Sequence, residues 1–69
     1  MSKNVKVLFG KQLRKVRMAK GISQEELAFR SGLHRTYVSS VERGERNISI
    51  VNIQKLSEAL GVDISNLMP

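Results

Sequence analysis

The chain has 69 residues, no cysteine, and twelve Lys and Arg against six Asp and Glu, which gives a net charge of +6 and a pI near 10.4. The lack of cysteine excludes disulfides and thiolate metal sites. No apolar run approaches the roughly 18 residues of a membrane span, and the N-terminus lacks the apolar core of a signal peptide. We therefore expect residues 1–69 to form one small, soluble domain that works in the cytoplasm.

The positive charge is concentrated in the first two thirds of the chain. Residues 1–46 hold eleven basic and four acidic side chains, a net +7, whereas residues 47–69 hold one basic and two acidic side chains, a net −1. A basic domain with such a pI is typical of nucleic-acid binding. A basic surface kept only for solubility is the simpler alternative.

The first predicted helix lies before Gly21. Phe9, Leu13 and Val16 recur at i, i+4 and i+7, which is the spacing of one apolar stripe on a helix. Lys20 and Gly21 favour its end, because a cation suits the last turn of a helix and glycine suits the residue that follows it.

Two short helices follow, separated by a glycine turn. Ser23 and Glu26 form a capping-box pattern that opens the first of them, which ends at Gly32. The next helix spans about residues 35–43 and ends at Gly44. Two short helices joined by a tight glycine-containing turn form a helix-turn-helix unit.

The remaining residues predict two further helices. Ser49 caps a helix whose apolar stripe begins with Ile53 and Leu56, and Asp63 caps a last short turn through Leu67. No stretch alternates apolar and polar residues as a strand does. The sequence therefore predicts an all-α fold: a compact five-helix domain with a helix-turn-helix.

One side of the predicted helix 35–43 carries residues that a helix interior disfavours. Serine and threonine compete with the backbone for hydrogen bonds and are commoner at caps and turns. At about 100° per residue, Val38 and Val41 face inward. The opposite side gathers Thr36, Ser39, Ser40 and Arg43, with Arg35 on its flank. The second helix of such a unit projects, so this face needs no core residues.

Several stretches together resemble one family. Ser-Gln-Glu-Glu-Leu-Ala (23–28), Ser-Gly-Leu (31–33) and Val-Ser-Ser-Val-Glu-Arg-Gly (38–44) resemble the Cro/phage-repressor-like (Xre-type) helix-turn-helix family of DNA-binding regulators. Within it, residues 34–39 and 42–49 are most similar to the controller proteins of restriction–modification systems. These small dimers time the expression of an endonuclease relative to its methyltransferase. The resemblance implies a phage-repressor-type fold and a transcriptional regulator. Another phage or chromosomal repressor of the same fold is the alternative within the family, and whether binding represses, activates or does both stays open.

The resemblance implies that the helix near 35–43, the recognition helix, enters the major groove of double-stranded DNA. Arg35 is able to donate a bidentate pair to guanine, and Thr36 offers a hydroxyl to a base edge and a methyl group to thymine. Ser39 and Ser40 are short enough to let the helix sink into the groove. We expect these four residues to contact bases; an exposed arginine in a surface salt bridge is the alternative for Arg35.

A second set of residues is placed to contact phosphates, which positions a protein without reading sequence. Gln24 begins the preceding helix, where backbone N–H groups and the helix dipole favour an anion; an ordinary first-turn role is the alternative. Tyr37 lies within reach of either a phosphate or the edge of the core. Arg43, Arg46 and Asn47 follow the recognition helix, where they are able to grip the next phosphates.

Arg17 and Glu42 have a mainly structural explanation. Each lies about 40° from an inward residue of its helix, and an unpaired buried charge is very costly. We expect the two to pair, and the family carries such a pair at these positions. His34 is the only histidine, so we expect no metal site and place it at the N-cap of the recognition helix.

No catalytic constellation is visible, because the chain has no cysteine and a single histidine. We expect no enzymatic activity, cofactor or small-molecule ligand. The alternative class is a protein-interaction module, such as an antitoxin or coactivator; an antitoxin usually adds a segment that covers its toxin, and we expect none after Pro69. RNA binding is disfavoured because the three aromatic residues are not clustered.

A domain of this size contacts few base pairs, so we expect a homodimer on an inverted-repeat operator with half-sites about 34–36 Å apart. The nearly neutral residues 47–69 are the expected dimerisation part. We place the dimer interface at Ile50 and Val51, beside the apolar stripe of their helix, and at Leu67 and Met68 near the chain end. Further pairing of dimers on DNA stays open.

Overall fold

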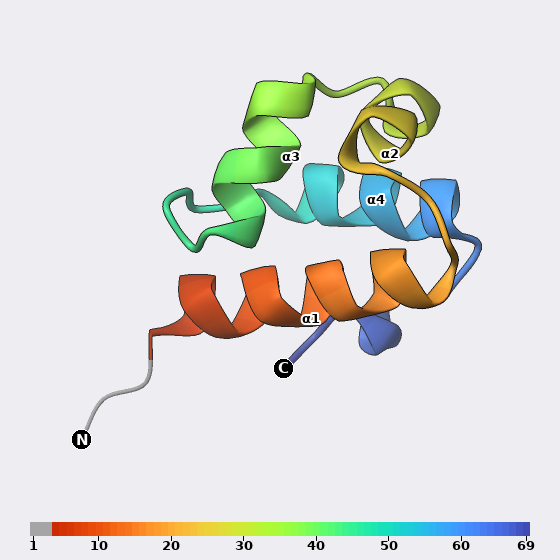
Figure 1. Cartoon of the computed structure of the whole chain (residues 1–69). Coiled ribbons are helices and arrows are strands. Elements are labelled where there is room, and N and C mark those ends of the chain that lie inside the picture. Colours follow the sequence, from red (N-terminus) through yellow and green to blue (C-terminus); the bar gives the residue numbers. More distant parts are fainter. Residues whose placement is uncertain (1–3) are drawn as a thin grey trace.

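The computed structural model describes residues 4–69, which form four α-helices and one short 3-10 helix (Figure 1). The helices are α1 (Val5–Ala19), α2 (Gln24–Ser31), α3 (Arg35–Glu42), α4 (Ile50–Leu60) and the 3-10 helix η1 (Ile64–Asn66). No strand occurs between residues 4 and 69. The prediction of an all-α fold is confirmed.

The fifth predicted helix is not an α-helix, so the five-helix prediction is corrected to four. Asn66 N–H donates to the carbonyl of Asp63 and Leu67 N–H to that of Ile64, both at 2.9 Å. These i→i+3 bonds define a 3-10 turn, a geometry that is used in short pieces. Asp63 occupies the N-cap position, but its side chain makes no capping hydrogen bond.

Serine side chains cap α2 and α4 where the sequence predicted the helix starts. Ser23 Oγ accepts from Glu26 N–H at 3.0 Å, and Ser49 Oγ accepts from Asn52 N–H at 3.1 Å. The Glu26 carboxylate accepts from Arg30 Nε at 2.7 Å, one turn further along α2. Ser23 thus caps α2 as the capping-box pattern predicts. Glu26 instead stabilises the helix through an i,i+4 ion pair with Arg30.

The turn between α2 and α3 depends on Gly32. This residue has a φ of 73° in the left-handed region. Its N–H donates to the carbonyl of Phe29 at 3.3 Å, and the N–H of Leu33 donates to the carbonyl of Ala28 at 3.0 Å, at the end of α2. Glycine adopts this conformation without the steric cost that a Cβ imposes. The chain therefore leaves α2 sharply and begins α3 after only two more residues.

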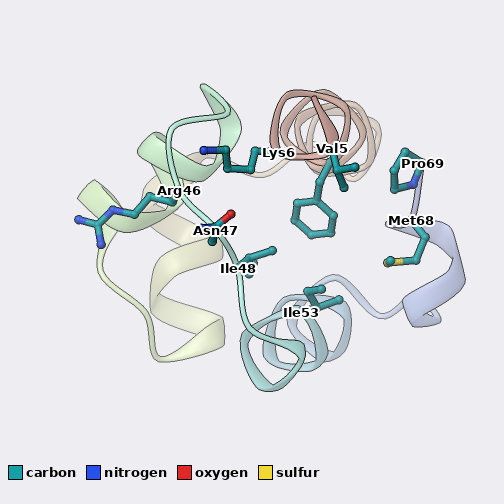
Figure 2. Close-up of a pocket in the computed structure, with 9 residues that line it drawn as sticks. Val5, Lys6, Arg46, Asn47, Ile48, Ile53, Met68 and Pro69 are labelled. Atoms are coloured by element: carbon teal, nitrogen blue, oxygen red, sulfur yellow. The ribbon is translucent and has the colours of Figure 1, made fainter. Parts of the chain in front are cut away.

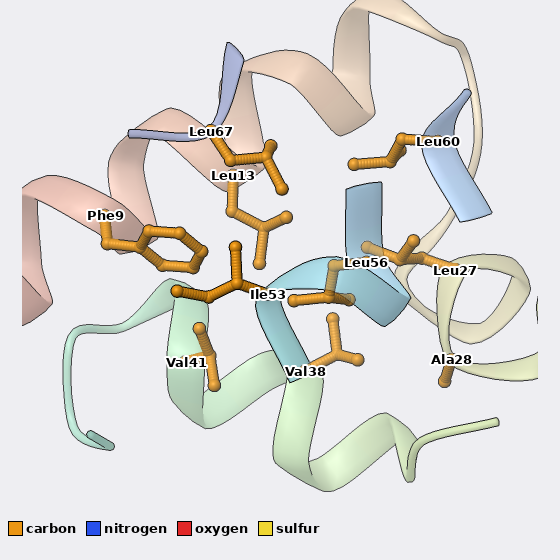
Figure 3. Packing of buried hydrophobic residues seen from close by; sticks show 10 residues of the cluster. All are labelled: Phe9, Leu13, Leu27, Ala28, Val38, Val41, Ile53, Leu56, Leu60 and Leu67. Carbon is orange, nitrogen blue, oxygen red and sulfur yellow. The ribbon is translucent and has the colours of Figure 1, made fainter. Parts of the chain in front are cut away.

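One hydrophobic core joins all four α-helices and the segment after η1 (Figure 3). Its buried members are Phe9, Leu13, Leu27, Ala28, Val38, Val41, Ile53, Leu56, Leu60 and Leu67. Leu67 has no exposed area and lies beside Leu13 of α1 (Figure 3). The prediction that Leu67 contacts a partner protomer is therefore wrong, because its side chain is fully buried inside its own domain.

The backbone of α1 lies against the C-terminal end of α3 (Figure 1). A Cβ on Gly10 would stand 2.7 Å from the carbonyl oxygen of Glu42 and closer still to that of Val41. Gly44, with φ +75°, leaves a Cβ position only 2.8 Å from Cα of Val7. Two glycines thus permit a close approach that fixes where α3 ends relative to α1.

None of the helices in residues 4–69 combines the length and apolarity that crossing a membrane requires.

Candidate nucleic-acid interface

A buried polar network ties α1, α2 and α3 together. Arg17 Nε donates to Glu42 Oε2 at 2.6 Å and Arg17 Nη2 to Glu42 Oε1 at 3.0 Å, a bidentate pair. Arg17 Nη1 also donates to the carbonyl of Ile22 at 2.9 Å, and Gln24 Nε2 donates to Glu42 Oε1 at 3.0 Å. The Arg17 and Glu42 side chains are 12% and 3% exposed. The pair expected from the sequence is present, and it orients α3.

The outward side of α3 presents Arg35 and Thr36, which are both exposed, and Ser39, which is half-buried. Ser40 is different: it is only 6% exposed, and its hydroxyl donates to the carbonyl of Tyr37 at 2.8 Å. The prediction that Ser40 contacts a base is therefore wrong. Its hydroxyl is satisfied within the helix and its side chain is buried.

Arg43, just after α3, is held by two neighbours. Its Nε and Nη2 donate to the Glu45 carboxylate at 3.0 and 3.2 Å, and its Nη1 donates to Ser39 Oγ. This hydrogen bonding lowers the pKa of the Glu45 carboxyl from its usual value and raises the pKa of Arg43. Both side chains are more than half exposed, so the solvent screens the pair. The sequence reasoning missed Glu45, although its charge two residues after Arg43 was a visible signal.

Tyr37 joins the recognition helix to α4. Its hydroxyl oxygen accepts from Asn52 Nδ2 at 3.0 Å, and the guanidinium of Arg46 lies 5.5 Å from the centre of its ring, within cation–π range. The half-buried ring packs against the core. Of the two positions that the sequence left open for Tyr37, its ring takes the core edge. Nothing in the sequence pattern singled out Asn52.

The N-terminal end of α3 has fewer side-chain contacts to the rest of the domain than the C-terminal end, where Glu42 pairs with Arg17. His34 is the N-cap residue, as expected, but its side chain makes no capping hydrogen bond. Arg46 and Asn47 are both exposed in the segment between α3 and α4. Cationic and hydroxyl-bearing side chains of α3 and of the segment after it form a surface that we call the α3 surface. It consists of Arg35, Thr36, Ser39, Arg43, Arg46 and Asn47.

An apolar hollow of about 190 Å³ lies beside this surface (Figure 2). It lies between the start of α1, the segment before α4 and the end of the chain. Its apolar lining residues are Val5, Phe9, Ile48, Ile53 and Met68, and its other lining residues are Lys6, Arg46, Asn47 and Pro69. Its volume is below the roughly 300–1,000 Å³ of common ligand pockets.

Four exposed apolar side chains either line the hollow or closely follow one of its lining residues in the sequence. Val5 and Met68 line it and are 63% and 46% exposed, and Ile50 and Val51, just after the lining residue Ile48, are 72% and 60% exposed. Within residues 4–69, no three His, Asp or Glu side chains are grouped as metal ligands would be.

The sequence of this chain is similar to that of known regulators. The helix-turn-helix family model matches residues 13–67. Control protein C.BamHI of Bacillus amyloliquefaciens is 51% identical over 69 residues, which cover 99% of this chain and 85% of that protein. Control protein C.MunI of a Mycoplasma species is 46% identical over 65 residues, which cover 93% of this chain and 88% of that protein.

Its fold is similar as well. The crystal structure of the restriction–modification controller protein C.AhdI from Aeromonas hydrophila matches with a TM-score of 0.89 at 57% sequence identity, covering 91% of this chain and 96% of that one. These relatives are named as control and controller proteins rather than as enzymes. The chain therefore belongs to the helix-turn-helix family of DNA-binding transcriptional regulators, and it is closely related to the restriction–modification controller proteins.

Proposed function

We propose that this protein is a restriction–modification controller that binds an inverted-repeat operator as a homodimer, in the cytoplasm. The observation that carries the proposal is the α3 surface: a short helix with an exposed arginine and hydroxyls, held from behind by the buried Arg17–Glu42–Gln24 network. A network that fixes a helix while leaving its outer face free suits a helix that enters a groove.

The residues that contact bases lie mainly in the first half of α3. Arg35 supplies the bidentate donor that guanine O6 and N7 accept, and Thr36 supplies a hydroxyl and a methyl group. Ser39 contributes from the next turn once Arg43, which it binds in the free protein, turns to a phosphate. Ser40 has no part in this contact because it is buried.

Phosphate contacts surround the base-reading residues. Arg43, Arg46 and Asn47 are exposed at the C-terminal side of α3. Gln24 uses one of its two amide hydrogens on Glu42, so the other is free for a phosphate at the start of α2, where the helix dipole also favours an anion. The hydroxyl of Tyr37 is already bonded to Asn52, yet it retains a hydrogen to donate.

We place the dimer interface at exposed apolar side chains of α1, α4 and the chain end. Ile50, Val51 and Met68 remain from the sequence-based prediction, and Val5 of α1 joins them because it is exposed and lines the hollow together with Met68. Exposed apolar side chains that gather in one place mark interaction sites more often than scattered ones do. A twofold axis through this surface would present two α3 helices to half-sites about 34–36 Å apart.

The test is selection of bound duplexes from a random DNA pool at about 0.15 M salt, a physiological ionic strength, followed by sequencing. We expect enrichment of one inverted repeat with half-sites about one helical turn apart. Binding without any enriched sequence, which disappears as salt rises, would contradict the proposal, because phosphate contacts alone behave in that way.

A further inference from the structure

The outer side of α1 carries basic side chains that take no part in the α3 surface. Lys11, Arg14 and Lys15 lie at i, i+3 and i+4, so they share one side of the helix. All three are exposed. Met18, which is 59% exposed, lies on the same side of the helix, one turn after Arg14. We call these four residues the α1 outer face.

No acidic side chain neutralises this face. The salt bridges formed within residues 4–69 are Arg17–Glu42, Arg30–Glu26 and Arg43–Glu45. All six acidic residues of the chain occur at position 25 or later. Like charges at i, i+4 disfavour a helix, so the Lys11–Lys15 pair lowers the stability of α1 unless a polyanion neutralises it. This arrangement is complementary to phosphate.

The α1 outer face is left uncovered between two occupied flanks. On one flank Gly10 lies against the last carbonyls of α3, and on the other Gln12 Nε2 donates to the carbonyl of Asn66 at 2.8 Å. Figure 1 shows α1 along one edge of the molecule, with the end of α3 directed at it. A helix that fills a groove about 12 Å wide has its ends beside the phosphates that border the groove. Because the C-terminal end of α3 lies against α1, the phosphates beside that end of the helix lie on the α1 side of the groove.

We propose that the α1 outer face binds the sugar-phosphate backbone of the same duplex, outside the half-site contacted by α3. The proposal rests on the proposed function, since α3 must first be seated on DNA. The contact reads no sequence. Its contribution comes from the release of condensed counterions, so it increases affinity most at low salt.

The test compares three duplexes: the selected operator alone, the operator extended on each side by one and a half helical turns, about 15 base pairs, and an extended duplex without the operator. Binding constants are measured across a salt series. The wild-type protein should show a steeper dependence of log K on log salt with the extended operator than with the bare operator, because it releases more counterions.

Lys15→Gln and Lys55→Gln form a matched pair of variants. Both lysines are exposed within helices, neither forms an ion pair among residues 4–69, and Lys55 lies on α4. Lysine and glutamine have similar helix propensities. Lys15→Gln should reduce the salt slope with the extended operator by about 0.9 for each phosphate that the lysine no longer neutralises and leave the bare operator unaffected. Lys55→Gln should change neither slope.

The triple variant Lys11→Gln/Arg14→Gln/Lys15→Gln should bind the extended and bare operators with the same salt slope. Equal slope changes in Lys15→Gln and Lys55→Gln, or equal wild-type slopes with both operators, would overturn the proposal. Capture of a second, separate duplex that disappears in the triple variant would assign the face to bridging and also overturn it.

Failure of the proposed function would appear differently from failure of the α1 proposal. In that case the wild-type protein would not distinguish the operator from the extended duplex without it. The comparison of Lys15→Gln with Lys55→Gln on the extended duplex without the operator would still decide whether α1 contacts DNA.

Discussion

The two ends of α3 are held in opposite ways. At the C-terminal end, Glu42 is buried in a bidentate pair with Arg17, and the backbone of α1 at Gly10 touches the last carbonyls. At the N-terminal end, His34 makes no side-chain cap, and Arg35 is exposed. One end sets the direction of the helix, and the other end is exposed. Under the proposed function, this helix of eight residues is anchored at one end and contacts bases with the other.

Removing the anchor should have the largest effect. Glu42→Ala leaves the Arg17 guanidinium, 12% exposed, without its partner. Breaking a buried pair by deleting one member costs about 3–5 kcal/mol. Urea unfolding should show a loss of this size, and operator binding should fall with it.

Two further variants keep this prediction decisive even if Glu42→Ala does not fold. Glu58→Ala, at an exposed position of α4, should stay within about 0.5 kcal/mol of the wild type. Arg17→Met/Glu42→Met removes both charges and should recover most of the lost stability, because apolar replacements of buried pairs are often neutral. A double variant as unstable as Glu42→Ala would contradict the charge explanation.

The close approach at Gly10 should be the next most sensitive feature. Gly10→Ala places a methyl group 2.7 Å from the carbonyl oxygen of Glu42, which forces α1 and α3 apart. Overpacking of this kind costs about 1–3 kcal/mol, and we expect thermal unfolding to show a lower midpoint. At an open helix position the same change stabilises by up to about 1 kcal/mol. A rise in stability would therefore show that α1 and α3 are not in contact there.

The free end should respond in DNA binding and not in stability. Arg35→Ala should lose about 1–3 kcal/mol of discrimination at one base position per half-site, with unchanged urea unfolding. Binding to a panel of operators with single-base changes measures this. Arg46→Ala is the comparison: it should weaken all sequences alike and lower the salt slope by about 1. If both variants gave the same profile across the panel, the separation of base and phosphate contacts would be wrong.

Periodicity and caps predicted the anchored parts of the molecule well. The stripe from Phe9 to Leu13, the caps at Ser23 and Ser49 and the Arg17–Glu42 pair all follow from local spacing and the cost of burying charge. The stripe and the caps depend on residues that are close in the sequence. The ion pair follows from the high free-energy cost of an unpaired buried charge.

The errors have tertiary causes. On the helical wheel Ser40 lies between the outward Thr36 and Tyr37, whose ring packs at the edge of the core, so the spacing alone does not decide whether it is exposed or buried. Leu67 was assigned to a partner because nothing local shows that η1 folds back onto α1. The close approach of α1 and α3 at Gly10 cannot be predicted from the sequence either, because a glycine inside a helix does not indicate which segment packs against it. Each depends on how distant segments pack.

A better cap at the free end should increase stability slightly. His34→Ser would supply a hydroxyl to accept from a backbone N–H in the first turn of α3, as Ser23 does for α2. Good N-caps are worth about 1 kcal/mol, which thermal unfolding should detect. His34→Ala is the control, since it removes the imidazole without adding an acceptor, and it should give no gain. Equal gains in both variants would attribute the effect to removal of the histidine.

The smallest stability effect is expected at the exposed Arg43–Glu45 pair, although its effect on binding is informative. Hydrogen bonding from Arg43 lowers the pKa of Glu45, so any stabilisation by the pair is present above the unfolded-state pKa and is lost as pH falls through the lowered folded value. Because both side chains are exposed, Glu45→Gln should leave the unfolding midpoint unchanged at neutral pH.

The same substitution should strengthen binding to every duplex. Glu45 competes with phosphate for Arg43 and adds a negative charge beside the α3 surface. Glu45→Gln therefore frees a cation and removes a repulsion, which should increase affinity for operator and non-operator DNA by the same factor and leave the ratio between them unchanged, because a phosphate contact reads no sequence. Glu58→Gln makes the same charge change on α4, an element outside the α3 surface, and should increase both affinities less than Glu45→Gln does. A changed ratio in Glu45→Gln would mean that Arg43 contributes to base discrimination, and equal gains in Glu45→Gln and Glu58→Gln would mean that Glu45 does not compete with phosphate for Arg43.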